Sequence, residues 1–400
     1  MAWFECAPGD VNRKHHVKSP EQFDLAIVGS GIVGLAHALA AARQGLRTVV
    51  IDRDARANGA SIRNFGFITV SGQERGEVWR RAMRSRDIWL EIAGPAGIEI
   101  LQRGTVVVAR RPEARVVVEA FLRTEMGEGC QLFEPADMEK HARVSGKGLS
   151  GGLWSPHELR VESRDAIPRV AALLANRHGV EFRRNTAVRS VAPPVVTTSR
   201  GDILADKVIV CPGDDLTTLY PERIALQGVT RCKLQMMRLA DPGIRLPAAL
   251  MSDLGLARYA GYAALPEAAA LRSRLEADQR QALDNGVHLI VVQGIDGTLV
   301  VGDSHHYAMT PDPFGSDHVD EIILDEFRAI FGGIAPPVIE RWTGTYASAP
   351  DKTMFVDAPQ DDVRLVMITS GTGASTSFAI AEEVVGELFG MAPSEVRKTA

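Results

Sequence analysis

The stretch FDLAIVGSGIVGLAHALAAARQGLRTVVIDRD, residues 23–54, decides the fold. An apolar strand over 23–28 leads into a glycine-rich turn, and an Ala-rich helix over 35–44 follows. Gly45 suits the end of that helix, and a second apolar strand covers 46–51. Together these segments predict a β-α-β unit of about 30 residues, the length expected of a nucleotide-binding crossover.

The turn after the first strand fits the pattern G-x-G-x-x-G, and each glycine has a physical reason. Gly29 permits the tight turn, Gly31 lets a pyrophosphate approach the backbone, and Gly34 lets the helix pack closely on the strand. The N-terminus of the helix presents free N–H groups and partial positive charge to the phosphates. Asp52, after the second strand, is placed to accept hydrogen bonds from a ribose diol. These residues predict a dinucleotide site, but the fingerprint alone does not distinguish FAD from NAD.

The composition is that of a soluble globular protein with room for two core-bearing lobes. The chain has 400 residues, 45% hydrophobic and 24% charged, and a net charge of −5. This balance argues against a nucleic-acid partner, and no apolar run is long enough for a membrane helix. Residues 1–22 lack the apolar centre of a signal peptide and are expected to form a loose extension. The four cysteines have no metal-like spacing, which predicts no metal site, reduced thiols and a cytoplasmic location.

Beyond the fingerprint, three more stretches carry a family resemblance. They are GASIRNFGF at 59–67, DKVIVCPGDD at 206–215 and RLVMITSGTGASTSFAIAEEVVGELFG at 364–390. With them the chain resembles the D-amino-acid oxidase and glycine oxidase family of FAD-dependent oxidoreductases, from about Phe23 to about Phe389. The resemblance implies non-covalent FAD, because no residue suggests a covalent flavin bond. The contacts it implies, together with those of the fingerprint, are Gly29, Ser30, Gly31, Ile32, Val33, Gly34, Asp52, Arg53, Ser61, Arg63, Asn64, Phe65, Gly66, Val188, Cys211, Gly213, Gly371, Thr372, Gly373, Ala374, Ser375 and Thr376.

Particular roles follow from that resemblance. The glycine-rich turn at 371–376 opens a helix over 377–389 whose N-terminus is expected to face the pyrimidine edge of the flavin and to stabilise negative charge there. Val188 is expected at the adenine end, and Gly213 near the diphosphate. Cys211 falls in the strand that supports the diphosphate.

The loop at 59–73 carries one arginine, Arg63, in an otherwise uncharged setting. Small residues such as Gly59 and Gly66 suit a backbone that runs close to a flavin ring. Arg63 is then expected beside the ring or in the substrate cavity, where an anion gives it a partner. The alternative is an ion pair between Arg63 and a nearby carboxylate that only shapes the loop.

The expected fold class is α/β, with a Rossmann-like FAD-binding domain interleaved with a mainly antiparallel α+β substrate domain. The FAD-binding domain is assigned to 23–90, 155–225 and 325–400, and the substrate domain to 91–154 and 226–324. In the second insertion we expect a helix over 267–283 and a hairpin over 288–304, with Asp296-Gly297 as a type I′ turn. Its sheet is expected to roof the flavin with one face toward the ligand.

The substrate is expected to need an anion ligand and a proton-transfer group. Arginine binds carboxylate or phosphonate through forked hydrogen bonds, and Arg258 and Arg341, each expected in a strand, are the candidates. Histidine titrates in the right range for the proton, which favours His305 and His306 as catalytic groups. The alternatives are structural ion pairs for the arginines and a surface turn for the histidines. The residues expected to wall the cavity are Tyr259, Tyr307, Trp342 and Tyr346, although such aromatics are often core.

Within the family, several stretches look like a subgroup associated with phosphonate breakdown: SIRNFGF, LARYAGY at 256–262, VVGDSHHYAMTPDPF at 300–314 and ERWTGTYAS at 340–348. This likeness implies oxidation of 2-aminoethylphosphonate or its N-methyl derivative, by hydride transfer to flavin N5 and imine hydrolysis, with O2 as acceptor. The alternative is a glycine, sarcosine or D-amino-acid oxidase or dehydrogenase. The lysine that some relatives place near flavin N5 aligns near Val300, so oxidase and dehydrogenase both stay open, with Lys233 as a possible substitute. Other classes are a tRNA-modifying flavoprotein, which would need a basic face, and a catalytically silent flavin binder. The oligomeric state is not predicted.

Overall fold

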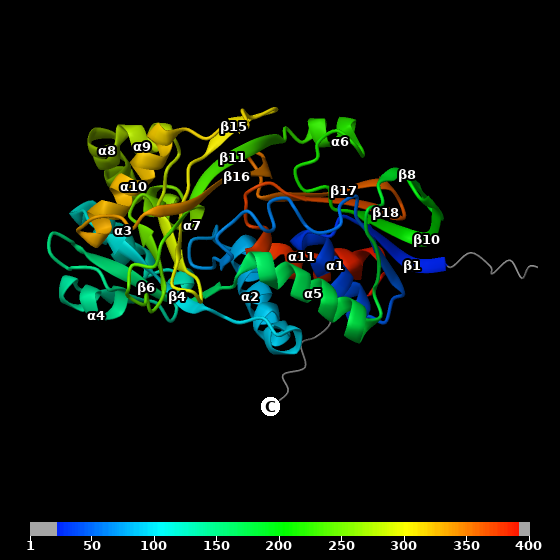
Figure 1. Cartoon of the computed structure of the whole chain (residues 1–400), viewed down its shortest axis with the longest axis horizontal. Coiled ribbons are helices and arrows are strands. Elements are labelled where there is room, and N and C mark those ends of the chain that lie inside the picture. Colours follow the sequence, from blue (N-terminus) through cyan, green and yellow to red (C-terminus); the bar gives the residue numbers. More distant parts are fainter. Residues whose placement is uncertain (1–21, 392–400) are drawn as a thin grey trace, which may run out of the picture.

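The computed structural model describes residues 22–391, and Figure 1 shows the chain as two neighbouring parts. Helices α8 (Ala268–Asp278), α9 (Arg280–Asp284) and α10 (Asp317–Phe331) gather at one end, and strand β1 (Gln22–Val28) lies toward the other. The extension expected over 1–22 lies outside the described residues except for Gln22, which begins β1.

The cofactor part is built on an eight-stranded sheet within the described residues. Its centre is parallel and buried on both faces, which explains the continuous apolar runs of its strands. Its strands are ordered β17-β18-β10-β1-β2-β7, and β9 pairs with β10 and with β8. The bounds are β2 Thr48–Ile51, β7 Glu181–Arg183, β8 Val188–Ala192, β9 Val195–Thr198, β10 Gly201–Val210, β17 Met354–Gln360 and β18 Val363–Ile368.

Helices cover this sheet and enclose a core between themselves and the strands. Helix α1 (Ile32–Arg43) packs against α5 (Ser163–His178) and the C-terminal helix α11 (Gly373–Leu388), which also packs against α2 (Glu77–Ala96). Figure 1 shows α1, α5 and α11 together next to β1. On another side of the sheet, α6 (Pro221–Leu226) contributes Ile224 to a second core. None of the helices in residues 22–391 has the length and apolar character to span a membrane.

The second part is a ten-stranded sheet within the described residues, and it is mainly antiparallel as expected. Only the pairing of β12 with β4 is parallel. The strands run β15-β11-β14-β13-β12-β4-β6-β3, with β16 on β11 and β5 on β6. The bounds are β3 Phe67–Ile68, β4 Gln102–Ala109, β5 Gln131–Phe133, β6 Gly151–Arg160, β11 Thr230–Leu239, β12 Ala249–Ser252, β13 Ile290–Gln293, β14 Leu299–Gly302, β15 His306–Ala308 and β16 Val338–Ser348.

Short helices cover this second sheet. Some of its strands lie outside the segments that were assigned to the substrate domain from the sequence. Strands β3 and β16 belong to it, although their residues fall in segments assigned to the FAD-binding domain. The two sheets therefore share segments of chain. The remaining helices are α3 Pro112–Phe121, α4 Met138–Ala142 and α7 Ala260–Ala263, with 3-10 turns over Glu125–Gly127, Pro135–Asp137 and Gly255–Ala257.

Three local expectations were wrong. The segment 256–262 is not a strand but a 3-10 turn followed by α7, so Arg258 projects from a helical connection. The helix expected over 267–283 breaks at Gln279 into α8 and α9. In the β13–β14 hairpin, Gly297 has positive φ but Asp296 does not, whereas a type I′ turn requires positive φ at both positions.

Candidate active site

A glycine-rich turn closes the carboxyl end of β1 against the end of β10. Gly29 has φ +105°, and a Cβ there would lie 2.4 Å from the carbonyl oxygen of Cys211. A Cβ at Gly34 would lie 1.9 Å from the carbonyl oxygen of Gly29, so no side chain fits between helix α1 and the turn. This crowding keeps the turn backbone free of side chains where a phosphate would approach.

Asp52, at the end of β2, fixes the conformation of this turn. Its carboxylate accepts hydrogen bonds from the Ser30 backbone N–H at 2.6 Å and from the Ser30 hydroxyl at 2.7 Å. It also accepts from the Asp54 N–H at 2.8 Å. Arg53, beside it, pairs with Asp215 at 2.6 Å between the charged atoms. The carboxylate therefore lies at the mouth of the glycine-rich turn, where the sequence pattern puts the acid of a dinucleotide site.

A cavity of about 1010 Å³ runs from this turn to the N-terminus of α11 and on to the second sheet. It is lined by most of the residues that the sequence predicts for the cofactor. The exceptions are Ser30, whose hydroxyl is turned to Asp52, and Thr376, whose hydroxyl donates to the Thr372 carbonyl. A space of this size and shape fits an extended dinucleotide, since ligand pockets for drug-sized molecules are typically about 300–1,000 Å³. The residues present therefore fit FAD.

The loop 59–66 forms one wall of the cavity and is held by a single asparagine. The Asn64 side-chain oxygen accepts from the Gly66 N–H at 2.6 Å and from the Ser163 hydroxyl at 2.8 Å. Its amide donates to the Ala60 carbonyl at 2.6 Å. The Ser61 hydroxyl accepts from the Ile32 N–H at 2.9 Å, which joins the loop to the first turn of α1.

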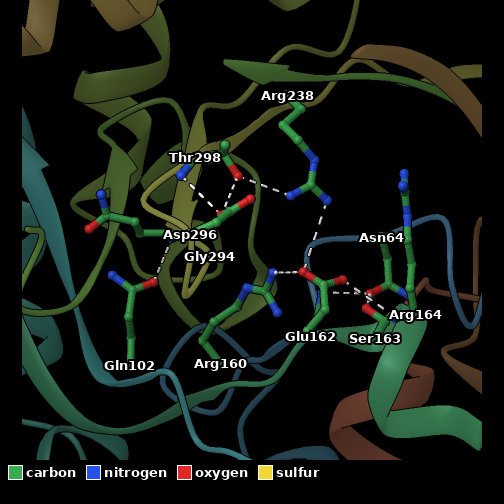
Figure 2. A network of polar contacts seen from close by, with 12 residues as sticks. Asn64, Gln102, Arg160, Glu162, Ser163, Arg164, Arg238, Gly294, Asp296 and Thr298 are labelled. Atoms are coloured by element: carbon green, nitrogen blue, oxygen red, sulfur yellow. Dashed lines mark hydrogen bonds and ion pairs between the residues drawn. The ribbon is translucent and has the colours of Figure 1, made fainter. Parts of the chain in front are cut away.

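A charged network ties this wall to the second sheet, and Figure 2 shows Glu162 between Arg160 and Arg238 of β11, with Arg238 4.0 Å from the Glu162 carboxylate. Next to Ser163, Glu162 accepts from Arg160 at 3.0 Å. Glu340 of β16 accepts from Arg164 at 2.9 Å and from Arg238 at 3.2 Å. The start of α5 is therefore clamped between the loop on one side and strands β11 and β16 on the other.

The opposite wall is the N-terminus of α11. Within the described residues no side chain caps this terminus, so the N–H groups of Gly373 and Ala374 stay available to a ligand, whereas those of Ser375 and Thr376 donate to the Thr372 carbonyl. The Ser375 hydroxyl accepts from the Thr69 N–H at 2.9 Å, and Trp89 of α2 donates to the Ala374 carbonyl at 2.8 Å. These contacts fix the helix end facing the cavity, where it can stabilise negative charge.

A group of polar side chains lies where the cavity meets the second sheet. Arg258 donates to the Tyr307 hydroxyl at 3.0 Å, and the Tyr259 hydroxyl lies 3.1 Å from His288 Nε2. Asp303 lies between two imidazoles, with Oδ1 at 3.5 Å from His288 Nδ1 and Oδ2 at 3.9 Å from His305 Nε2. We call His288, Asp303 and His305 the buried triad; all three line the cavity and are buried.

Burial sets the protonation of the buried triad. It raises the pKa of Asp303 from 3.8 to about 7, against the opposing pull of the Arg258 charge. Burial and then Arg258 lower the pKa of His288 well below 6.5. The same two causes, joined by His288, lower the pKa of His305. At neutral pH both imidazoles are therefore uncharged, and Asp303 is the group poised to exchange a proton.

The cavity brings together six of the nine residues expected to contact substrate or act in catalysis. Its lining includes Arg63, Arg258, Tyr259, His305, Tyr307 and Tyr346. The other three lie outside it. Arg341 pairs with Asp320 at 2.8 Å, the His306 ring contacts Asn285 at 3.2 Å, and Trp342 packs under the guanidinium of Arg164 at 5.1 Å. Arg341 therefore forms a structural ion pair, which was the alternative to a role in substrate binding.

Arg63 and Arg258 share an unusual property among the charged residues of the cavity. Within residues 22–391 neither guanidinium has a carboxylate oxygen within 4 Å, whereas Arg53 has Asp215. Arg63 donates to the Asn58 side chain at 3.1 Å and Arg258 to Tyr307. Both positive charges are thus left for an anion that enters the cavity.

Sequence reasoning missed His288 and Asp303. The only local signal was an acid directly after the buried strand β14 and a histidine just before the buried strand β13. Lys233, considered as a substitute for the lysine near flavin N5, donates to the Phe314 carbonyl at 2.8 Å and does not line the cavity. Val300 of β14 is buried in the core.

The fold and the cavity define a nucleotide-dependent oxidoreductase. The dinucleotide site at the glycine-rich turn opens into a polar space lined by Arg258, Tyr307 and the buried triad, which we call the chamber. Residues 24–386 match the family described as DAO, FAD dependent oxidoreductase. The chain belongs to this family and is an FAD-dependent oxidoreductase.

Individual relatives are more distant. The chain is 26% identical over 200 residues to monomeric sarcosine oxidase from Bacillus sp. (strain B-0618), and the match covers 48% of this chain. It spans 51% of that protein, so about half the length of the relative is matched.

Solved structures show the same fold over almost the whole chain. Glycine oxidase from Geobacillus kaustophilus superposes with a TM-score of 0.73 at 17% identity, covering 93% of this chain and 96% of that one. L-proline dehydrogenase from P. horikoshii gives a TM-score of 0.75 at 17% identity, covering 94% and 96%. The interleaved arrangement of the cofactor and substrate parts is therefore that of known flavoprotein oxidoreductases.

Proposed function

We propose that this protein oxidises a small primary or secondary amine that carries an acidic group, and that the substrate is 2-aminoethylphosphonate or its N-methyl derivative. The products are phosphonoacetaldehyde and ammonia or methylamine, with O2 taking the electrons to give H2O2. Bound FAD supplies the two-electron oxidation by accepting hydride from the carbon next to nitrogen. The protein itself has to bind, orient and deprotonate the amine.

One observation carries the proposal: Arg63 and Arg258 line the cavity, and within residues 22–391 neither has a carboxylate partner. Anionic substrates are held by such guanidinium groups, which offer forked N–H donors. The name of a relative, sarcosine oxidase, supports an amine with an acidic group as the substrate class.

A phosphonate suits the donors around Arg258 better than a carboxylate does. The Tyr307 hydroxyl accepts from Arg258, and the hydroxyls of Tyr307 and Tyr346 lie within hydrogen-bond reach of the Cys232 thiol, a weak acceptor that a ligand oxygen can replace. Tyr346 also lines the cavity, and its ring lies 6.4 Å from that of His305. Donors from an arginine and from tyrosine hydroxyls can serve three oxygens, whereas a carboxylate has two.

The second candidate is oxidation of an amino acid such as glycine, sarcosine or a D-amino acid. It is favoured by the matches to sarcosine oxidase and to the fold of glycine oxidase. A single guanidinium can hold a carboxylate by two parallel hydrogen bonds, which Arg258 is able to make. A cytoplasmic location belongs to the same proposal and is supported by the free thiols of Cys130, Cys211 and Cys232.

Anaerobic bleaching of the bound flavin tests the proposal. The FAD-loaded enzyme is mixed with 2-aminoethylphosphonate, its N-methyl form, glycine, sarcosine and D-alanine, and absorbance near the flavin band is followed. We expect the phosphonates to bleach the flavin fastest and at the lowest concentration. Faster bleaching by the carboxylates would replace the phosphonate assignment with the second candidate. No bleaching by any of these amines would reject amine oxidation.

Arg258→Met separates the substrate site from the cofactor site. Since Arg258 lies in the chamber and not at the glycine-rich turn, the variant is expected to retain FAD while its half-saturating concentration of phosphonate rises at least tenfold. Arg341→Met is the matched control, because its guanidinium is already paired with Asp320 outside the cavity. Loss of FAD from the Arg258 variant would contradict its placement.

A further inference from the structure

We propose that the carboxylate of Asp303 binds the ammonium group of the substrate and removes one proton from it before oxidation. This inference rests on the proposed amine oxidation and adds the group that prepares the amine. An ammonium nitrogen has no lone pair to support hydride loss from the neighbouring carbon, so a proton acceptor in the chamber is a chemical requirement.

The position of Asp303 fits this task. It follows the last residue of β14 and lines the same cavity as Arg258, with 5% of its surface exposed. Its Oδ1 atom is buried and has no hydrogen-bond partner among the described residues. A buried, unpartnered carboxylate oxygen is costly unless a ligand supplies the missing donor. An ammonium group offers such N–H donors.

The hydrogen bond of His305 leaves its Nε2 atom, which faces Asp303, without a hydrogen. His305 Nδ1 lies 2.9 Å from the Gly286 carbonyl, which can only accept, so this nitrogen carries the hydrogen. In a neutral imidazole the other nitrogen, Nε2, is then without hydrogen, and it lies 3.9 Å from Asp303 Oδ2. Two lone pairs facing each other favour the form of Asp303 that has gained a proton.

His288 completes the setting from the other side. If the Tyr259 hydroxyl donates to Nε2 at 3.1 Å, the hydrogen of His288 sits on Nδ1, which faces Asp303 Oδ1 at 3.5 Å. Nδ1 and Oδ1 form no hydrogen bond within the described residues, so in this tautomer His288 favours the carboxylate only through the dipole of its N–H group, whereas Nε2 of His305 favours the carboxylic acid. Such a pair of neighbours lets Asp303 exist in both states without rearrangement of the site.

The charged and titratable groups around Asp303 decide how strong a base it is. They are Cys232, Arg258, Tyr259, His288 and His305. Arg258 is the only one charged at neutral pH, and its charge favours the carboxylate. When the acidic end of the substrate binds Arg258, part of that charge is neutralised and Asp303 becomes a better proton acceptor. Binding of the anion thus prepares removal of the proton.

The step is a simple proton transfer. One N–H bond of the ammonium group breaks, its electron pair stays on nitrogen as a lone pair, and an O–H bond forms on Asp303. The substrate becomes a neutral amine and Asp303 a neutral acid, so the buried chamber loses one positive and one negative charge. Removing opposite charges together avoids a net charge in a site of low dielectric.

A cation site is the competing use of the buried triad. The spacing of the cysteines predicted no metal site, yet the donor atoms of His288, Asp303 and His305 all lie within 4.8 Å of one another. The positive charge of Arg258, however, acts on all three residues and would repel a divalent cation. Asp303 is the one carboxylate among these three residues, and a single negative charge beside Arg258 fits an ammonium ion better than a divalent metal ion.

The test is the pH dependence of anaerobic flavin reduction by saturating 2-aminoethylphosphonate, with glycine as a second probe, in the FAD-loaded enzyme. In the wild type we expect the rate to rise up to about pH 7 and then level off. In Asp303→Asn the rate should increase about tenfold per pH unit up to pH 9, because only substrate that is already neutral can react. Asp303→Glu, which keeps a carboxylate, should restore a plateau at a lower rate.

Binding of ethylphosphonate, which lacks the amine, separates loss of the ammonium contact from loss of structure. Its affinity, measured by the change in flavin absorbance, should change less than twofold in Asp303→Asn, while the half-saturating concentration of 2-aminoethylphosphonate rises at least tenfold. Asp320→Asn, which alters a buried carboxylate outside the cavity, is the matched control and should keep the wild-type pH profile.

Three results would overturn the proposal. A plateau in Asp303→Asn identical to that of the wild type, with bleaching intact, would remove Asp303 from proton transfer and leave the proposed function standing. Elemental analysis that finds one bound divalent metal ion per chain, lost in Asp303→Asn, would assign the triad to a cation. A complete lack of bleaching by every amine in the wild type would reject the proposed function and this step with it.

Discussion

Replacing Asp303 by asparagine should change the stability of the protein in a pH-dependent way. Burial raises the pKa of Asp303 from 3.8 to about 7, so the folded protein keeps this proton over a range where the unfolded chain has lost it. The stabilisation from the bound proton is complete below pH 3.8 and is lost as the pH rises toward 7. Asparagine does not titrate, so the variant lacks this loss.

The size of the effect follows from the two pKa values. Each pH unit between them is worth about 1.4 kcal/mol, and integration from pH 5 to pH 8 gives roughly 2.6 kcal/mol. The free energy of unfolding of Asp303→Asn, relative to the wild type, should therefore rise by about that amount over this range. The lost carboxyl contacts add a constant to this difference in free energy of unfolding at every pH, so the informative quantity is its change with pH.

Urea unfolding of the FAD-loaded proteins at pH 5, 6, 7 and 8, with excess FAD throughout, measures this slope. Asp320→Asn controls for the removal of a buried carboxylate from the second part of the molecule. A difference between Asp303→Asn and wild type that stays constant from pH 5 to pH 8 would refute the reasoning, since it would mean that Asp303 does not titrate in this interval. If the charge of Arg258 outweighed burial, the pKa of Asp303 in the folded protein would lie below 3.8, and the difference would change only below about pH 5.

Three other substitutions test separate parts of the structure. Gly34→Ala puts a Cβ 1.9 Å from the Gly29 carbonyl oxygen, so we expect the variant to bind no FAD or not to fold. The purified product would then be colourless or insoluble. A yellow variant of normal stability would contradict the packing of α1 on the turn. Arg341→Met removes the half-exposed partner of the buried Asp320 carboxylate, which keeps its hydrogen bond from Gln235, and should cost roughly 1–3 kcal/mol in urea unfolding. Bleaching kinetics should stay within twofold of the wild type, and a large loss of substrate affinity would show that Arg341 contacts the substrate. Burial lowers the pKa of His37 from 6.5 to about 4, and its Nδ1 contacts the Val33 carbonyl at 2.7 Å. The neutral imidazole therefore stabilises the fold above pH 6.5, and this stabilisation is lost as the pH falls toward 4. His37→Gln should therefore lose less stability than the wild type between pH 6.5 and pH 4.5, by roughly 2 kcal/mol in urea unfolding, and equal losses would show that His37 is not responsible.

The cofactor end of the site was predictable because its signals are local. Strand β1, the turn at Gly29 to Gly34 and helix α1 follow one another directly. Gly29 is required by its contact with Cys211 at the end of the neighbouring strand, and Gly34 by its contact with Gly29. The presence of α11 was equally predictable, since a glycine-rich turn before a long run of helix formers indicates a helix start. The helix was expected from residue 377 and begins at Gly373, inside the predicted turn.

The substrate end was not predictable, because it depends on contacts between distant segments. Antiparallel pairing of Ile290 with Gly302 brings His288 and Asp303 together, and neither residue has a local pattern that marks it. Arg258 was placed in a strand because its neighbours are apolar and aromatic, but the segment is helical and buries Tyr262 against Phe121.

The aromatic strand β16 shows why side-chain direction escaped the sequence. Tyr346 pairs with Cys232 and reaches the cavity, whereas Arg341, an odd number of positions away, projects from the opposite face to Asp320. Trp342 shares the face of Tyr346 but lies beyond the cavity, near Arg164. Alternation gives the two faces of a strand, and only the packed sheet shows where along a face the cavity ends.

The hydrogen bonds from Thr69 to Ser375 and from Trp89 to Ala374 have a consequence for biosynthesis. Early parts of the chain supply the glycine-rich turn, but the facing wall is added only when residues 371–388 have been made and packed on α1 and α2. During translation, then, the binding groove stays unfinished from the synthesis of residues 29–34 until residues 371–388 have emerged. Capture of the coenzyme accordingly follows the synthesis of α11, and the coloured product reports that these two distant segments have met.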